Sequence, residues 1–291
     1  MKTSLRFSFC IIFLLSLTSG CAISLSDTHF SGEKAYQHVQ SQMEFGARIP
    51  GSYAIQKTAA YISETLQNNS WNTISQSFEF EGVPLSNVIA KKGSGERVLI
   101  IATHYDTRAQ ADHDVDIAFQ KEPVPGANDG ASGTAVLLEL SRIAKVPDDT
   151  QVWLVFFDGE DQGHLNGWEW SIGADYFVQH LGLQPHKVVI VDMIGDKDLN
   201  IYQEQNSSKD LTEEIWASAE ELDYISYFIP ETRYAMIDDH LPFLNHGIPT
   251  ALLIDFDYEF WHTTQDTIEN ISSDSLQIVG DVLCHWLENT P

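Results

Sequence analysis

The stretch "QVWLVFFDGED" at residues 151–161 joins a buried strand to a cluster of acidic side chains. Residues 152–157 are apolar, β-branched or aromatic, which predicts a strand in the core. This strand runs directly into Asp158, Glu160 and Asp161. Buried carboxylates repel one another, and each costs several kcal/mol unless its charge is compensated. We therefore expect a cation beside this turn.

Four other runs have the same strand-like character, at residues 86–92, 97–103, 186–194 and 250–256. Helical periodicity appears at residues 33–45, 53–68, 131–145, 171–182, 209–222 and 274–288. Apolar strands that alternate with helices predict an α/β fold. We expect a three-layer sandwich in which helices flank a mixed, mostly parallel central sheet. The polar, proline-containing stretch 107–128 is expected to form a loop near the active site.

Polar side chains gather where the predicted strands end. The strand 97–103 leads into His104, 186–194 contains Asp192 near its end, and 250–256 is soon followed by His262. In open α/β sheets, ligands bind at the carboxyl edge of the strands. Histidine and carboxylates are zinc ligands, and a catalytic zinc often takes three of them and keeps one position open. The sequence therefore predicts a metal site at this edge.

The charge of the chain bears on its partners. The formal net charge is −26, and the sequence has no basic run. A protein of this kind cannot neutralise phosphates, so we expect no nucleic-acid partner.

The N-terminus has the features of a secretion signal. Lys2 and Arg6 precede the apolar run 7–17, which is too short to span a bilayer comfortably. The following "TSGC" resembles a bacterial lipobox, which would make Cys21 the lipidated N-terminus; an ordinary signal peptide with a chance cysteine is the alternative. We expect a lipoprotein signal peptide at 1–20, a tether at 21–32 and a single catalytic domain at 33–291. Ala22 follows Cys21 where an inner-membrane retention signal would have Asp, so we expect attachment to the outer membrane, with the protein facing the periplasm or the cell surface.

The chain resembles the M28 zinc-peptidase family over nearly all of its predicted mature length. The matching motifs are "HYD" (104–106), "GANDGASG" (126–133), "FFDGED" (156–161), "VDMIG" (191–195), "DDHLPF" (238–243), "GIPT" (247–250) and "WHT" (261–263). Within the family, "RIPGS" (48–52), "SNVIA" (86–90), "DDHLPF" and "FWHT" (260–263) are similar to motifs of the glutaminyl cyclase branch. Enzymes of that branch convert an N-terminal glutamine into pyroglutamate, whereas the aminopeptidases of the family hydrolyse the first peptide bond.

The resemblance implies a metal site and its ligands. Asp129, Asp161 and His262 match the ligands of one zinc ion, which is the number we expect. His104 and Asp192 match the extra ligands of a second ion in the aminopeptidases, but similar cyclases retain these residues and hold one zinc, so a second ion stays an alternative. Cyclases often have Glu at the position of Asp161. Asp has a shorter reach, so the metal or the backbone must shift slightly. The family also implies a cis peptide bond between Asp129 and Gly130.

The resemblance also implies the catalytic residues. Glu160 would be the general acid and base, and Asp192 and Asp238 would form a hydrogen-bonded network with it.

Six aromatic residues are candidates for an apolar substrate pocket, with core packing as the alternative for two of them, Trp170 and Phe256. The six are Trp168, Trp170, Phe256, Tyr258, Phe260 and Trp261.

These features predict a zinc-dependent glutaminyl-peptide cyclotransferase that acts on peptide or protein N-termini and releases ammonia. The alternative is an M28 metallo-aminopeptidase with one or two zinc ions. A third hypothesis is a non-catalytic periplasmic binding lipoprotein, against which the presence of Glu160 argues, because a binding protein needs no base.

Overall fold

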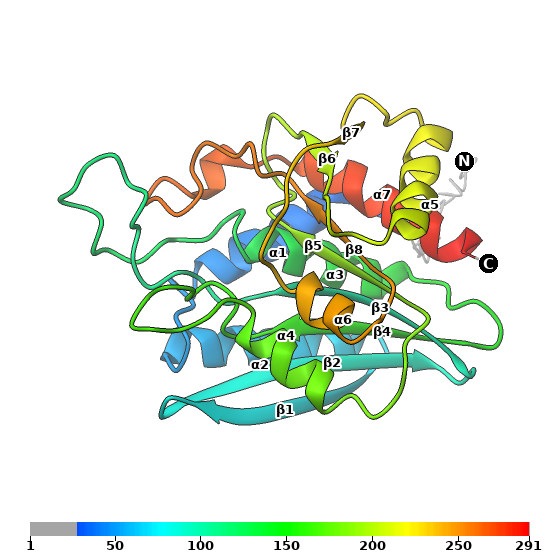
Figure 1. Ribbon diagram of the computed structural model, residues 1–291, viewed down its shortest axis with the longest axis horizontal. Helices are drawn as coiled ribbons and strands as arrows, with labels where there is room; N and C mark the ends of the chain where they lie inside the picture. Colours follow the sequence, from blue (N-terminus) through cyan, green and yellow to red (C-terminus); the bar gives the residue numbers. More distant parts are fainter. Residues whose placement is uncertain (1–27, 291) are drawn as a thin grey trace, which may run out of the picture.

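The computed structural model describes residues 28–290 (Figure 1). The predicted signal peptide, Cys21 and most of the expected tether lie outside these residues. The described end of the tether packs on the domain: Phe30 is buried, and the backbone N–H of Ser31 donates to Glu139 Oε1 at 3.0 Å. Ser31 also caps the first helix, α1 (Gly32–Met43), by accepting the backbone N–H of Lys34. The folded part therefore begins before residue 33.

The main sheet has six strands in the order β1-β2-β4-β3-β5-β8. Their bounds are β1 (Asn72–Phe80), β2 (Val83–Gly93), β3 (Arg97–His104), β4 (Thr150–Phe157), β5 (Lys187–Asp192) and β8 (Thr250–Ile254). The pairs β3–β4, β3–β5 and β5–β8 are parallel, while β1–β2 and β2–β4 are antiparallel. The prediction of a mixed, mostly parallel sheet is therefore confirmed.

Helices cover both faces of this sheet. One face carries α1 together with α2 (Tyr53–Asn68), α3 (Ala131–Ile143), α5 (Lys209–Glu221) and α7 (Ser273–Asn289). The other carries α4 (Ile172–Gln179) and α6 (His240–Asn245), which lie in front of the sheet in Figure 1. The strands feed both cores by alternation: Leu99 and Ile101 pack on the first side, and Val98 and Ile100 on the second. These three layers match the expected sandwich.

The carboxyl ends of the parallel strands meet at one edge of the sheet. Antiparallel β2 begins at the same edge and fixes the residue that follows β4: the backbone N–H of Ser86 donates to Asp158 Oδ2 at 3.0 Å. The Asn87 side-chain oxygen in turn accepts the backbone N–H of Asp158 at 3.1 Å. Asp158 thus anchors the turn after β4 to the neighbouring strand.

Three shorter elements lie outside the sandwich. The strands β6 (Ile201–Gln203) and β7 (Phe228–Thr232) form a parallel pair, and η1 (Ile268–Asn270) is a single 3₁₀ turn before α7. Among residues 28–290, no helix has the length and apolar character needed to cross a membrane.

Candidate active site

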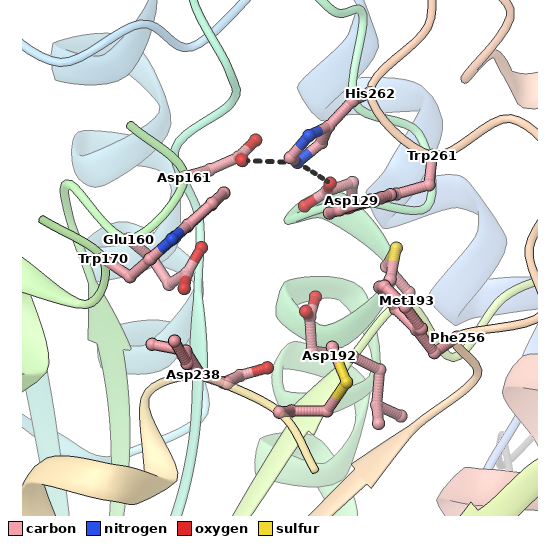
Figure 2. A pocket seen from close by; sticks show the side chains of 13 residues that line it. Asp129, Glu160, Asp161, Trp170, Asp192, Met193, Asp238, Phe256, Trp261 and His262 are labelled. Atoms are coloured by element: carbon pink, nitrogen blue, oxygen red, sulfur yellow. Dashed lines mark ion pairs between the residues drawn. The ribbon is translucent and has the colours of Figure 1, made fainter. Parts of the chain in front are cut away.

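The structure brings together the three side chains expected to bind one metal. Asp129 lies just before α3, Asp161 follows β4, and His262 lies in the loop after β8. Their ligand atoms all lie within 4.8 Å of one another, and all three residues are buried. His262 Nε2 is 2.9 Å from Asp161 Oδ1 and 3.7 Å from Asp129 Oδ2. Figure 2 shows the three side chains pointing toward one another at one side of a pocket.

These residues fit a zinc ion. Neither carboxylate oxygen of Asp161 receives a hydrogen bond, although His262 Nε2 is so close. The nearest cationic nitrogen, Arg108 Nη1, is 3.8 Å from Asp161 Oδ1, too far for a hydrogen bond, so a bound cation would compensate this buried carboxylate more fully. Burial and the charge of Asp129 raise the pKa of Asp161 well above its usual range, and a bound divalent cation would reverse this effect. One nitrogen and two carboxylates beside an open pocket are a suitable ligand set for catalytic zinc.

The backbone on either side of Asp129 is held by long-range contacts. Asp266 accepts the backbone N–H of Asn128 at 2.8 Å and that of Asp129 at 3.1 Å. The predicted cis bond between Asp129 and Gly130 is wrong, because residues 28–290 contain no cis peptide bond. Gly130 instead adopts a φ of +90°, and a side chain there would bring its Cβ to 2.4 Å from the backbone oxygen of Asp106. Glycine is therefore needed for this turn.

Glu160 lines the pocket beside the metal-binding residues. Its Oε1 accepts a hydrogen bond from the Ser171 hydroxyl at 3.3 Å. Burial raises the pKa of Glu160 well above its usual range, and the nearby carboxylates of Asp239, Asp238 and Asp161 act in the same direction against the opposing charge of His104. A carboxyl group that holds a proton more strongly than usual is suited to general acid-base chemistry.

Asp192 and Asp238 lie across the same pocket from the metal-binding residues, as Figure 2 shows. Asp192 Oδ1 is 3.0 Å from His104 Nε2, and Asp238 Oδ1 accepts the backbone N–H of Asp239. Within the described chain no hydrogen bond joins either carboxylate to Glu160, so the expected network is not formed in this structure. Burial raises the pKa of both carboxyl groups, for Asp238 well above its usual range.

His104 lies among three carboxylates. Its Nε2 is 3.0 Å from Asp192 Oδ1 and 3.2 Å from Asp129 Oδ1, and its Nδ1 is 3.5 Å from Asp106 Oδ1. Burial alone would lower the pKa of His104, but these carboxylates outweigh it and raise the pKa well above its usual range. His104, Asp129 and Asp192 form a second group that could hold a metal. The expected residues for a second ion are therefore together, and the number of ions stays a prediction.

The pocket has a volume of about 210 Å³, close to the size of a single amino-acid residue. Of the six candidate aromatic residues, Trp170, Phe256 and Trp261 line it; Trp168, Tyr258 and Phe260 are not part of its wall. Its other apolar residues are Met193, Met236, Ile237 and Ile254.

Two residues that line this pocket, and Ser171 beside Glu160, have backbones in the left-handed region. They are Met193 at φ +46°, Ser171 at +59° and His262 at +57°. Such conformations cost about 1–3 kcal/mol each and concentrate at functional sites. Burial also lowers the pKa of His262 to about 3, which keeps its imidazole neutral and able to bind a metal.

The sequence did not predict a role for the buried residues that form hydrogen bonds with the backbone around the site. Besides Asp106 and Asp266, the buried Arg48 donates from its Nε to the backbone oxygen of Tyr105 at 3.1 Å, and from Nη1 to that of Pro125 at 2.9 Å. Burial lowers the pKa of Arg48 to about 10. Arg48 belongs to the "RIPGS" motif, which was the one signal that pointed to it.

Comparison with known proteins places the chain among enzymes with related chemistry. Residues 87–287 match peptidase family M28. The chain is 30% identical over 204 residues to the aminopeptidase YwaD of Bacillus subtilis, a match that covers 64% of this chain but only 39% of that relative.

Solved structures match over more of the chain. A Zn-dependent exopeptidase from Parabacteroides distasonis has a TM-score of 0.84 and 27% identity, covering 90% of this chain and 99% of its own. The glutaminyl cyclase of Porphyromonas gingivalis has a TM-score of 0.85 and 29% identity, with the same coverage. The chain therefore belongs to the enzymes of peptidase family M28.

Proposed function

We propose that the protein is a zinc-dependent glutaminyl-peptide cyclotransferase, which converts the N-terminal glutamine of peptides or proteins into pyroglutamate and releases ammonia. The observation that carries this proposal is the position of Glu160, a buried carboxyl group in a pocket of single-residue size beside Asp129, Asp161 and His262. The likeness to the Porphyromonas cyclase, over 90% of this chain, supports cyclisation as the reaction.

Each group at the site has a task in this reaction. Zinc bound by Asp129, Asp161 and His262 would act as a Lewis acid on the γ-carbonyl of the substrate glutamine. Glu160 accepts a proton from the substrate α-amine as that nitrogen bonds to the γ-carbonyl carbon. Glu160 then returns the proton to the departing amide nitrogen, which leaves as ammonia when its bond to that carbon breaks. The carboxyl group ends the cycle as it began.

The pocket wall contributes orientation. Trp170, Phe256 and Trp261 line a space close to the size of one residue. Cyclisation requires that the glutamine side chain fold back toward its own amine within it. Holding the two reacting atoms together replaces an intermolecular encounter with an internal one. An apolar wall also limits the water that could compete with the amine.

An aminopeptidase is the second candidate, and a specific observation favours it. His104, Asp129 and Asp192 form a group that could hold a second metal. The likeness to the Bacillus aminopeptidase and to the Zn-dependent exopeptidase points the same way. In that reaction Glu160 would accept a proton from water, and the first peptide bond would be cleaved.

Two measurements on the purified protein separate these functions. The first is the metal content per chain, and the second is the mass spectrum of products from matched peptides that begin with Gln or Leu. We expect one zinc, pyroglutamate from the Gln peptide with ammonia released, and an unchanged Leu peptide. Free Leu, more than one zinc and no pyroglutamate would establish the aminopeptidase instead. If zinc-loaded protein changed neither peptide, the binding-lipoprotein hypothesis would return.

A further inference from the structure

The second ring nitrogen of His262 has no assigned partner. In Figure 2 both dashed lines end on one ring nitrogen, Nε2, which faces Asp161 and Asp129. The other nitrogen, Nδ1, is buried and has no hydrogen-bond partner. An acidic oxygen lies nearby, because Asp112 Oδ1 is 3.7 Å from Nδ1. This separation is longer than a hydrogen bond, and a small movement of either side chain would close it.

Asp112 is itself held in place. Arg108 donates to both of its carboxylate oxygens, from Nε to Oδ1 and from Nη2 to Oδ2, each at 2.7 Å. This two-pronged geometry fixes the plane of the carboxylate as well as its position. Asp112 therefore presents Oδ1 to the imidazole in a defined direction.

The same arginine also contacts a second metal-binding residue, Asp161. Arg108 Nη1 donates to the backbone oxygen of Asp161 at 3.2 Å, and its Nη2 donates to that of Gly163 at the same distance. Its guanidinium lies 5.1 Å from the ring centre of Trp170, a residue of the pocket wall. Arg108 and Asp112 thus connect the turn after β4 with the loop that carries His262.

The backbone reinforces this connection. The N–H of His113, next to Asp112, donates to the backbone oxygen of His262 at 3.2 Å. His262 is in the left-handed conformation, so its position depends on such contacts. The loop 107–128 therefore contacts His262 through the backbone and faces it with a side chain.

We propose that Asp112 is a positioning residue for His262, accepting the Nδ1–H of the imidazole while Nε2 binds the metal. A metal-bound histidine usually donates its other ring N–H to a carboxylate or carbonyl, which fixes the tautomer and the direction of the lone pair. Arg108 keeps the accepting oxygen in place. This inference rests on the proposed metal site and assigns a role to residues outside its ligands.

The same atoms allow a different interpretation. Asp112, His113 and His262 lie close enough to hold a metal of their own. Both oxygens of Asp112 already receive hydrogen bonds from Arg108, and a metal there would have to compete with this cation. His262 would also have to give up its Nδ1 proton. The geometry therefore favours a hydrogen bond between Asp112 and His262 over a metal ion bound by Asp112, His113 and His262.

The test compares zinc affinity in three variants of the full-length protein. Asp112→Ala removes the acceptor, Asp112→Asn keeps one oxygen without the charge, and Asp116→Asn changes an exposed acid of the same loop as the matched control. Chelator competition should give a zinc dissociation constant about 10–100-fold higher for Asp112→Ala, the usual effect of losing such a partner. Asp112→Asn should fall between, and the control should equal the wild type. Asp112 also pairs with the buried Arg108, so the melting temperature of each metal-free variant is measured as well, and zinc affinity is compared under conditions in which all variants are folded.

A second measurement reports on the hydrogen bond itself. In zinc-loaded protein with ¹⁵N-labelled histidine, the Nδ1–H of His262 should give a slowly exchanging NMR signal that Asp112→Ala abolishes. Arg108→Lys leaves the acceptor present and should retain the signal. Unchanged zinc affinity and an unchanged signal in Asp112→Ala would overturn the proposal. It would also be overturned if the wild type bound more than one zinc and Asp112→Ala lost one of them, because Asp112 would then be a metal ligand. A wild type that binds no zinc would instead refute the proposed function.

Discussion

The carboxylate of Asp106 accepts the backbone N–H of Glu160 at 3.0 Å, across 54 residues of sequence. Its second oxygen accepts the backbone N–H of Asp161 at 3.2 Å and the side-chain amide of Gln162 at the same distance. One buried carboxylate therefore fixes the backbone of the proposed base and of a proposed metal ligand together. The turn after β4 is therefore fixed by Asp106, which lies just beyond the end of β3.

Replacing Asp106 with Asn should destabilise this turn. The amide keeps one acceptor oxygen, but its NH₂ group now faces the buried backbone N–H of either Glu160 or Asp161, which is left unpaired. We expect the free energy of unfolding to fall by about 1–3 kcal/mol, the range for losing a buried partner. Urea denaturation monitored by circular dichroism would measure this. Asp148→Asn, in an exposed loop, is the control, and equal stability of both variants would contradict the assigned role.

Glu160→Gln should preserve the fold and the metal but lose most of the turnover. The change is nearly isosteric and removes the proton-accepting group. The expected loss of kcat is about 10²–10⁴-fold, which is the usual contribution of general acid-base catalysis. Steady-state assays with a Gln-initiated peptide, together with metal analysis of the same sample, check both parts of this expectation.

The metal ligands supply the contrast to Glu160→Gln. Of the three residues whose ligand atoms lie within 4.8 Å of one another, Asp161→Asn replaces a charged ligand with a neutral amide, and His262→Ala removes the imidazole ligand. Both variants should lose zinc on dialysis under conditions where Glu160→Gln keeps it. If Glu160→Gln lost zinc while Asp161→Asn retained it, the roles of these two neighbours would be exchanged.

Much of the site could be predicted because its residues follow core strands. The apolar run before Asp158 predicted β4, and the carboxyl ends of parallel strands must share an edge. His104, Asp192 and the turn containing Asp161 therefore meet there, as expected. Strand β2 was expected from its apolar residues as well, although pattern alone did not show that it runs antiparallel to β4.

Other features depend on contacts that no local pattern contains. Asp266 holds the backbone of Asp129 from 137 residues away, and nothing in its neighbourhood marks it as different from a surface acid. Strand β1 was not predicted because most of its side chains are polar or partly exposed, as an edge strand allows; Ile74 is 49% exposed. The conformation at Gly130 depends on the nearby backbone of Asp106.

We also propose that Cys21 is acylated and forms the mature N-terminus, which would attach the enzyme to a membrane, in our interpretation the outer one. The "TSGC" run directly after a short apolar segment motivates this. Cys21→Ser should move the protein from the membrane fraction to the soluble fraction, as seen by immunoblotting. A mass spectrum of membrane-extracted wild type that lacks acyl mass, or that begins at another residue, would contradict the proposal.

The metal-free protein should lose stability as the pH rises, in part because of Asp239. This carboxyl group is fully buried, and neither of its oxygens has a hydrogen-bond partner. Burial, assisted by the carboxylates of Asp106 and Asp192 against the charge of His104, raises the pKa of Asp239 from 3.8 to about 8. The native state thus binds this proton more tightly than the unfolded state. Its stabilising contribution is complete below about pH 4 and is lost as the pH rises through about 8. Inside that window each pH unit can lower the free energy of unfolding by up to about 1.4 kcal/mol.

Asp239→Asn cannot ionise, so its melting temperature in the presence of a chelator should fall less steeply with pH than that of the wild type. Parallel slopes for the two proteins would show that Asp239 does not retain its proton in the folded state.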